Sequence, residues 1–190
     1  TSYVRVLLID FYDSFTFNLA HYLEAMDLQL NVVRYDQLSP ETLQAADAII
    51  LSPGPGLPNE KAGLSTLLDH FVRRTPILGV CLGMQALVEH LGGSLINQAQ
   101  VKHGVQETID IKSHDGLFRD LPKRVEVGLY HSWKVECPEN WLTAHSDAGV
   151  PMALERPEMM VYGVQFHPES VLTPLGKEIL CNFIQIVRHA

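Results

Sequence analysis

Short apolar runs alternate with segments of helical periodicity through the first half of the chain, and this alternation limits the possible folds more than any other feature. Residues 4–9, 48–51 and 76–80 are almost continuously apolar, which is typical of strands buried on both faces of a sheet. Between such runs, apolar residues recur at the three- and four-residue spacing of one helix face. The alternation predicts βαβ units, and therefore an α/β fold with a mainly parallel sheet covered by helices on both sides.

The pattern changes in the second half of the chain to short alternating segments separated by turn residues. We expect these segments to form antiparallel strands or hairpins at the edge of the core sheet. A final amphipathic helix is predicted over residues 176–188, and Ser14 is predicted to cap the first helix. The predicted strands are 4–9, 30–35, 48–51, 76–80, 105–111, 124–129, 141–146, 151–155 and 160–165, and the other predicted helices are 15–26, 62–72 and 84–91.

Composition excludes several functional classes. With 46% hydrophobic and 19% charged residues the chain can bury one sizeable core, so we expect a single domain over residues 1–190. The 22 Asp and Glu residues outnumber the 14 Lys and Arg residues and leave a net charge of −8, which disfavours nucleic-acid binding. Apolar runs are far shorter than the roughly 18 residues that span a bilayer. We therefore expect neither a nucleic-acid nor a membrane partner.

The three cysteines, Cys81, Cys137 and Cys181, are odd in number and widely spaced. This arrangement matches neither a disulfide framework nor a zinc site, so we expect no metal. The first residues run directly into a strand and show no basic segment followed by a small-residue cleavage site. A reducing cytoplasm is the expected location, and one cysteine could serve as a nucleophile.

Residues 77–85 run from a buried strand through Gly79, Cys81 and Gly83 directly into a helix. The Gly-x-Cys-x-Gly spacing is typical of a nucleophile elbow, because glycines on either side leave room for a sharp, strained turn. The helix start favours a thiolate, and the N–H of Leu82 could help to stabilise an oxyanion. The alternative is a small apolar cysteine in the core, but two flanking glycines would then have no purpose. We predict that Cys81 is a nucleophile.

A thiolate nucleophile needs a proton shuttle, and His167 is the best candidate among nine histidines. It ends a short predicted strand, and Glu169 follows two positions later, beyond a rigid proline. His167 could face the sulfur while Glu169 holds the other ring nitrogen, which predicts a Cys-His-Glu arrangement. Histidines on predicted helices or in polar stretches are interpreted as ordinary surface or satisfied polar residues.

Two loops are candidates for substrate contacts. The segment 52–56 (Ser-Pro-Gly-Pro-Gly) follows a buried strand at its carboxyl end, where open α/β sheets bind ligands. It lacks the Lys-Ser/Thr of a phosphate-binding loop, so Gly54 or Gly56 is more suited to supply an oxyanion donor, with a plain turn as the alternative. His131, followed by Ser132 and Trp133, could bind a polar amino acid or simply end a strand beside a half-buried tryptophan.

Four motifs, in this order along the chain, resemble those of the class I glutamine amidotransferase domain. They are Ser-Pro-Gly-Pro-Gly at 52–56, Gly-Val-Cys-Leu-Gly-Met-Gln at 79–85, Tyr-His-Ser at 130–132 and Gly-Val-Gln-Phe-His-Pro-Glu-Ser at 163–170. The resemblance covers essentially the whole chain and implies a three-layer, flavodoxin-like fold with added antiparallel strands. The opening at 9–19 is most similar to the small subunits of anthranilate synthase and aminodeoxychorismate synthase.

The resemblance implies a role for each matching position. Cys81 would attack the γ-carboxamide of glutamine, His167 would shuttle the proton, and Glu169 would orient His167. The products would be glutamate and ammonia, formed without a cofactor, and the ammonia would pass to a chorismate-binding synthase subunit. The residues implied to hold the oxyanion or line the glutamine site are Gly54, Pro55, Gly56, Leu82, Gln85, Ser132 and Trp133.

The chain departs from the family pattern at two places. Relatives often have Leu-His-Gly-Lys where this chain has Val-Lys-His-Gly-Val at 101–105, so no family role is carried over to that loop, which is a candidate contact with the partner. Trp133 replaces a common leucine, which we expect to be a mild change.

The ammonia could serve tryptophan synthesis, folate synthesis or both. A cysteine peptidase-like protein of similar fold is the alternative from another class.

Overall fold

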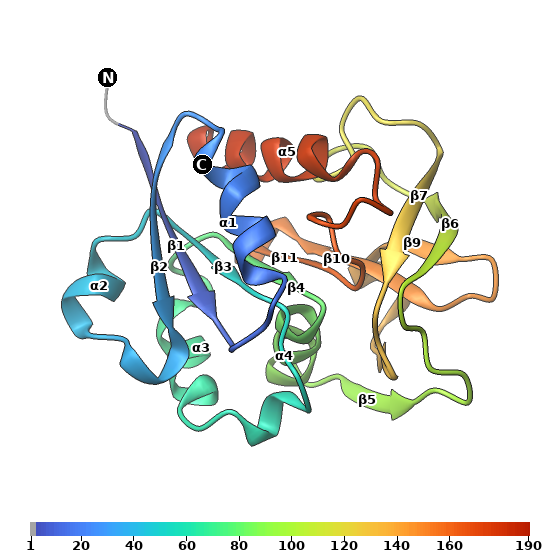
Figure 1. Ribbon diagram of the computed structural model, residues 1–190, viewed down its shortest axis with the longest axis horizontal. Helices are drawn as coiled ribbons and strands as arrows, with labels where there is room; N and C mark the ends of the chain where they lie inside the picture. Colours follow the sequence, from blue (N-terminus) through green and yellow to red (C-terminus); the bar gives the residue numbers. More distant parts are fainter. Residues whose placement is uncertain (1–2) are drawn as a thin grey trace.

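The computed structural model describes residues 3–190 and is built around a nine-stranded sheet with the order β2-β1-β3-β4-β11-β10-β9-β6-β7 (Figure 1). The five strands from β2 to β11 in this order run parallel. They are β2 (Leu28–Arg34), β1 (Val4–Asp10), β3 (Ala48–Leu51), β4 (Ile77–Val80) and β11 (Val161–Val164). The strands β3, β4 and β11 are buried throughout and β1 is buried in its middle, as expected for strands covered on both faces, whereas β2 is an edge strand with no buried residue.

The remaining strands of the sheet form an antiparallel extension next to β11. They are β10 (Pro151–Arg156), β9 (Leu142–Ser146), β6 (Val105–Ile111) and β7 (Arg124–Leu129), each antiparallel to its neighbours. A separate two-stranded ribbon pairs β5 (Ser94–Asn97) with β8 (Trp133–Glu136). The ribbon packs against α4 through Leu95 and Val135.

Two helical layers cover opposite faces of the parallel strands. Helices α1 (Thr16–Glu24) and α5 (Gly176–Arg188) pack on one face, and α3 (Leu64–Phe71) and α4 (Leu82–His90) pack on the other (Figure 1). The short helix α2 (Pro40–Gln44) lies beside α3, and 3-10 turns cover Tyr35–Gln37, Pro58–Glu60, Glu139–Trp141 and Pro157–Met159.

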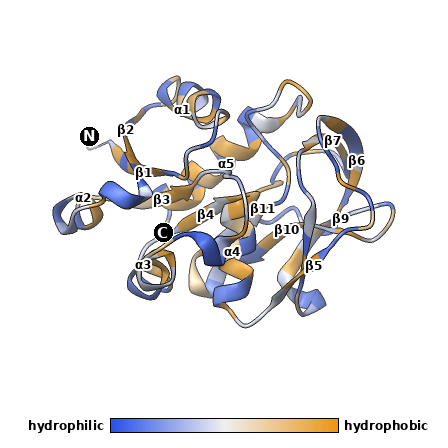
Figure 2. Ribbon diagram, turned by 60° about the horizontal axis from the view of Figure 1, so that its bottom comes forward, coloured by the Kyte–Doolittle hydropathy of each residue, from blue (hydrophilic) through white to orange (hydrophobic). Residues whose placement is uncertain are grey.

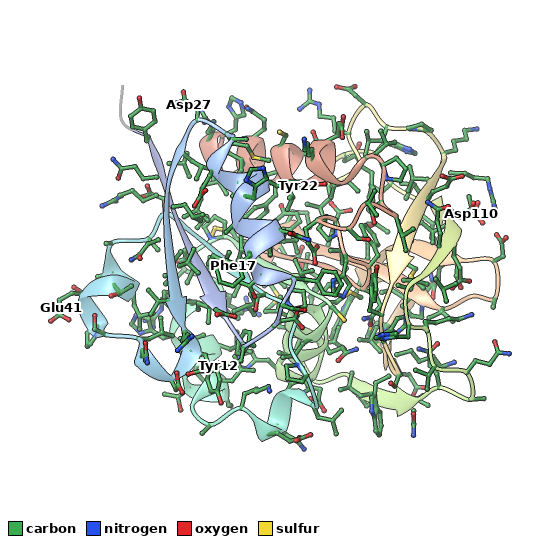
Figure 3. All side chains as sticks on the ribbon, viewed as in Figure 1. Tyr12, Phe17, Tyr22, Asp27, Glu41 and Asp110 are labelled. Carbon is green, nitrogen blue, oxygen red and sulfur yellow. The ribbon has the colours of Figure 1, made fainter. Side chains whose placement is uncertain are left out.

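Alternation along each strand divides the apolar side chains between the two layers. In β1, Leu8 belongs to the cluster under α1 and α5, whereas Leu7 belongs to the cluster under α3 and α4. Figure 2 shows the resulting apolar strands between helices that are polar on their outer sides. Phe17 is an exception, because it is 83% exposed and points away from α1 into solvent (Figure 3). Within residues 3–190 there is no helix of the length and apolar character needed to span a membrane.

The predicted α/β class and the parallel sheet with antiparallel additions are confirmed, but one strand was placed wrongly. The segment 160–165 is predicted among the antiparallel edge strands, and β11 does pair antiparallel with β10, but it lies in the middle of the sheet with β4 as its parallel neighbour on the other side. Every residue of β11 is buried, as a central strand requires. Its parallel partner lies far upstream in the chain, and short-range patterning cannot reveal such a pairing.

The predicted cap of the first helix is also wrong. Helix α1 starts at Thr16, and its N-cap residue, Phe15, makes no side-chain cap. Asp13 caps the start of the helix instead. Its Oδ1 accepts from the N–H of Phe15 at 2.8 Å, and its backbone oxygen accepts from the N–H of Thr16 at 3.2 Å. Thr16 Oγ1 also donates to Asp10 Oδ1 at 2.9 Å, which ties the helix start to the end of β1.

Candidate active site

Cys81 occupies the turn between β4 and α4, at the carboxyl edge of the parallel strands. Its backbone has φ +54° and ψ −101°, a strained conformation for a residue with a side chain. The N–H of Cys81 donates to the carbonyl of Val164 at 2.8 Å, so the turn continues the pairing of β4 with β11. The sulfur is thereby presented at the edge where open α/β sheets place their ligands.

The glycines around Cys81 allow α4 to approach the sheet closely. A Cβ on Gly83 would lie 2.6 Å from Cβ of Leu51 in β3, and a Cβ on Gly79 would collide with the backbone of Gly83. Gly163 in β11 meets Met84 in the same way, at 2.9 Å from its Cγ. The glycine pattern around Cys81 therefore reflects direct packing of the first turn of the helix on three strands.

His167 and Glu169 form a buried pair next to the elbow. His167 Nδ1 lies 2.6 Å from Glu169 Oε1, and the two side chains are 3% and 0% exposed. The backbone of His167 is held on both sides, because its N–H donates to Gly128 O at 3.0 Å and its carbonyl accepts from Thr173 Oγ1 at 2.7 Å. His167 Nε2 is buried and has no hydrogen-bond partner within residues 3–190, so this nitrogen is free for a reacting group.

The electrostatics of His167 favour its protonated form. Burial by itself lowers the pKa of the imidazole, but the neighbouring Cys81 sulfur and the Glu169 carboxylate outweigh burial and raise the pKa to about 10. Two aromatic rings enclose the imidazole, with centroids 4.9 Å away for Phe15 and 4.8 Å away for Tyr130. Cys81 from one motif and His167 and Glu169 from another thus lie together.

The loop 52–56 adjoins the elbow from β3. Ser52 Oγ accepts from the N–H of Phe11 at 2.9 Å and donates to the carbonyl of Pro53 at 2.7 Å, which fixes the start of the loop. Gly54 lies against Leu82, since a Cβ on this glycine would be 2.8 Å from Cδ2 of the leucine. Pro55 and Gly56 are exposed, so the structure places this loop at the rim of the elbow.

Gln85 joins the elbow helix to Trp133, which follows Ser132 and is the first residue of β8. Its Nε2 donates to the carbonyl of Trp133 at 3.1 Å, and the carbonyl of Ser132 accepts from the N–H of Gln98 at 2.8 Å. His131 is buried, and its Nδ1 lies 2.8 Å from the same Trp133 carbonyl. Burial lowers the pKa of His131, partly offset by that hydrogen bond, so this histidine is held neutral.

The family model for "Glutamine amidotransferase class-I" matches residues 7–187. The chain belongs to the class I glutamine amidotransferase family. Anthranilate synthase component 2 of Pseudomonas aeruginosa is 40% identical over 95% of this amidotransferase and 94% of that protein. Aminodeoxychorismate/anthranilate synthase component 2 of Bacillus subtilis is 39% identical over 96% of this chain and 97% of that protein.

The fold of this amidotransferase also matches solved structures. A crystal structure from Thermoplasma acidophilum, described as that of a GMP synthase subunit, superposes with a TM-score of 0.89. The match covers 100% of this chain and 96% of that one, at 24% sequence identity. The predicted class I glutamine amidotransferase fold is confirmed by this likeness and by the family match.

Sequence reasoning missed three contributors to the site of this amidotransferase. Phe15 and Tyr130 enclose His167, and Gln165 places its Nε2 3.4 Å from the Cys81 sulfur. Gln165 stood within a quoted motif, and a glutamine directly after an apolar strand was the available signal. Tyr130 also lies in one of the four motifs, and Phe15 lies in the 9–19 opening, but the helical spacing of Phe15 is typical of a core residue.

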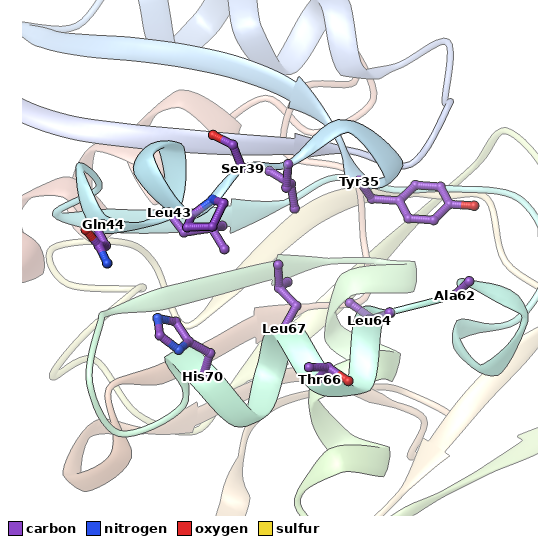
Figure 4. A pocket seen from close by; sticks show the side chains of 12 residues that line it. Tyr35, Ser39, Leu43, Gln44, Ala62, Leu64, Thr66, Leu67 and His70 are labelled. Atoms are coloured by element: carbon purple, nitrogen blue, oxygen red, sulfur yellow. The ribbon is translucent and has the colours of Figure 1, made fainter.

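A cavity of about 420 Å³ lies elsewhere in this amidotransferase, between α2 and α3 (Figure 4). Leu43 and His70 line it, together with Tyr35 and Leu67. Cys81 does not line this cavity, and it is 7% exposed in the turn between β4 and α4. The chemistry-bearing residues therefore gather at the carboxyl edge of the sheet and not in this cavity.

Proposed function

We propose that this chain is the glutaminase subunit of a two-subunit amidotransferase and hydrolyses L-glutamine to L-glutamate and ammonia. The observation that carries the proposal is the imidazole of His167, which is bonded to a buried carboxylate on one side and adjoins an elbow cysteine on the other. A buried carboxylate of this kind holds the ring in one orientation and stabilises its cationic form. We further propose that residues 1–190 form one domain.

The proposed reaction proceeds through a covalent thioester. The Cys81 sulfur attacks the γ-carbonyl carbon of glutamine, a C–S bond forms, and the carbonyl oxygen takes the negative charge. The protonated Nε2 of His167 gives its proton to the departing amide nitrogen, which leaves as ammonia when the C–N bond breaks. Water then attacks the thioester, His167 accepts a proton from it, and cleavage of the C–S bond releases glutamate.

Two loops are proposed to complete the site. The N–H of Leu82 belongs to the first turn of α4, where backbone donors lack partners within the helix, and Gly54 adjoins it. We assign the oxyanion to these donors with Gly56 as a further one. Gln85, Ser132 and Trp133 would contact the amino-acid end of glutamine, with Pro55 at the rim.

The relatives support a partner that uses the ammonia. One is named anthranilate synthase component 2, and the other is named for both anthranilate and aminodeoxychorismate synthesis. We propose that the partner is a chorismate-binding synthase subunit, with anthranilate formation for tryptophan as the first candidate. Aminodeoxychorismate formation for folate, alone or in addition, is the second candidate, because the Bacillus subtilis relative carries both names.

Replacing Cys81 with serine tests the proposed chemistry. Cys81→Ser should abolish ammonia release from glutamine, whereas the complex with its synthase should still form product from free ammonium. A matched control is Cys181→Ser, which changes an exposed cysteine on α5 and should leave both rates unchanged. Normal glutamine hydrolysis by the Cys81→Ser variant would contradict the proposal, as would failure of a glutamine-analogue electrophile to label Cys81.

A further inference from the structure

Gln165 is a fully buried glutamine at the end of β11, and the proposed chemistry gives it no role. Its Nε2 donates to the Cys81 sulfur at 3.4 Å. Its backbone N–H donates to the carbonyl of Met152 at 2.9 Å, so the residue continues the pairing of β11 with β10. A primary amide is costly to bury unless its hydrogen bonds are made, so the partners of this side chain are informative.

A chain of hydrogen bonds determines which way the Gln165 amide points. The carbonyl oxygen of Trp133 can only accept, so the group that faces it on Gln85 must be the amide nitrogen, at 3.1 Å. The same nitrogen lies 3.3 Å from Gln165 Oε1, which accepts its second N–H. With Oε1 engaged there, Gln165 must turn its Nε2 towards Cys81. The Trp133 carbonyl therefore determines the orientation of the Gln85 amide and, through it, the orientation of the Gln165 amide.

We propose that Gln165 is a positioning residue for the nucleophile, and that its N–H, oriented by Gln85, holds and stabilises the Cys81 thiolate. This inference rests on the proposed function for its meaning in catalysis. A hydrogen bond to a charged acceptor is worth more than one to a neutral acceptor, so the donor favours the ionised sulfur. His167 and Gln165 thus serve the sulfur differently, since His167 exchanges a proton and Gln165 supplies a fixed donor.

The arrangement also connects the sulfur to Trp133, which begins β8 and is proposed to contact glutamine. Trp133 O accepts from Gln85 and lies 2.8 Å from Nδ1 of His131, whose ring also contacts Gln98 at 2.9 Å. A shift of the Trp133 carbonyl would release Gln85 and then Gln165. The orientation of the Gln165 N–H that faces Cys81 therefore depends on the position of the start of β8.

The test replaces Gln165 with methionine, which has a similar volume and no N–H group. The rate of Cys81 alkylation by iodoacetamide at pH 7, followed by peptide mass spectrometry, should fall about tenfold, because one charge-assisted hydrogen bond is lost. The deficit should narrow at pH 9.5, where thiols ionise without help. His167 is the ionisable group facing the sulfur, with Glu169 behind it, and both remain in every variant. The glutaminase kcat should fall similarly, with KM unchanged.

A second variant and a control keep the test decisive. Gln165→Asn retains an amide, but its side chain is one methylene shorter, so the amide no longer reaches the sulfur. If the methionine variant does not fold, the asparagine variant should show the same loss of alkylation rate. Asn182→Leu removes an amide that bonds to the carbonyls of Leu117 and Arg119, far from the sulfur, and should alkylate at the wild-type rate. Wild-type alkylation in either Gln165 variant would overturn the proposal.

The readouts separate this inference from the proposed function. Alkylation needs no glutamine, so a wild-type protein without glutaminase activity would overturn the proposed function while the alkylation comparison still reports on Gln165. An active glutaminase whose Gln165 variants alkylate normally would overturn only the role of Gln165. Burial and the surrounding charges raise the pKa of the Cys137 and Cys181 thiols, so they react slowly at pH 7 and do not obscure Cys81.

Discussion

Two buried histidines in this amidotransferase have pKa values shifted in opposite directions. Burial lowers the pKa of both rings, but His167 is bonded to the Glu169 carboxylate and lies beside the Cys81 sulfur, and these raise its pKa to about 10. His131 is bonded to the Trp133 carbonyl, which offsets burial only in part. The neighbouring groups, and not the depth of burial, therefore decide the direction of each pKa shift, and they suit His167 to the proposed proton transfer.

The Glu169 carboxylate is the natural residue with which to test this difference. Glu169→Gln keeps the shape and can accept a hydrogen bond from His167 Nδ1, but it removes the negative charge. The pKa of His167 should fall, and the glutaminase kcat should fall about a hundredfold, within the range for a general acid–base group. An imidazole NMR titration and steady-state kinetics measure the two effects. An unchanged kcat with a lowered pKa would show that the charge is not needed.

The same pair predicts how stability depends on pH. The pKa of His167 is raised to about 10 in the folded state, against about 6.5 for an unfolded histidine. Its contribution to stability is therefore complete below pH 6.5 and is lost as the pH rises through 10. Urea unfolding at pH 6.5 and pH 9.5 should show a smaller loss of stability in Glu169→Gln than in the wild type. Equal losses in the two proteins would contradict the pairing.

At the scale of elements, close packing of α4 on the sheet gives the elbow its shape. Gly83→Ala places a Cβ against Leu51 and should lower the free energy of unfolding by about 3 kcal/mol, as overpacking does. Gly92, after the end of α4, is a matched control with φ +98° and open space around it, so Gly92→Ala should cost only about 1 kcal/mol of strain. Urea unfolding compares the two variants, and equal costs would mean that the helix can move away from β3.

Strand β10 carries a buried carboxyl group that ties it to the neighbouring loop. Glu155 Oε1 accepts from the N–H of Leu117 at 3.0 Å, whereas Oε2 has no partner within residues 3–190. Burial raises the pKa of Glu155, and hydrogen bonds offset this rise in part. Because the pKa is raised in the folded state, the contribution of Glu155 to stability is complete at low pH and is lost as the pH rises through the folded-state pKa. Glu155→Gln should therefore raise the free energy of unfolding at pH 8, and raise it by less at pH 4.5. A uniform effect at both pH values in thermal unfolding would refute this ionisation argument.

At the scale of the whole molecule, the parallel sheet gathers the site at one edge. The segments that follow β1, β3, β4 and β11 all lie at the carboxyl edge, and each contributes to the surroundings of Cys81. The antiparallel extension contributes Tyr130, which follows β7. The loop 52–56 and the segment 130–133, which leads into β8, lie at this edge, and movement of either one would change access to the sulfur.

A free-standing glutaminase would waste ammonia, so the proposed synthase subunit should control these loops. Adding the synthase should raise the glutaminase kcat about tenfold, a typical coupling between two sites. Ammonia release by the isolated glutaminase, compared with release by the reconstituted complex, measures this effect. Equal rates would remove the gating hypothesis and leave the proposed hydrolysis unaffected.

The sequence by itself determined the α/β class, the elbow at Cys81 and the pairing of His167 with Glu169. These are short-range properties, because strand burial, a glycine-bracketed turn and a two-residue separation are all visible in local patterning. The tertiary structure decided the rest. The central place of β11 and the contact of Gln165 with Cys81 join residues far apart in the chain. Local periodicity carries no information about such pairings, since they depend on which buried strands compete for the same neighbour in the folded sheet.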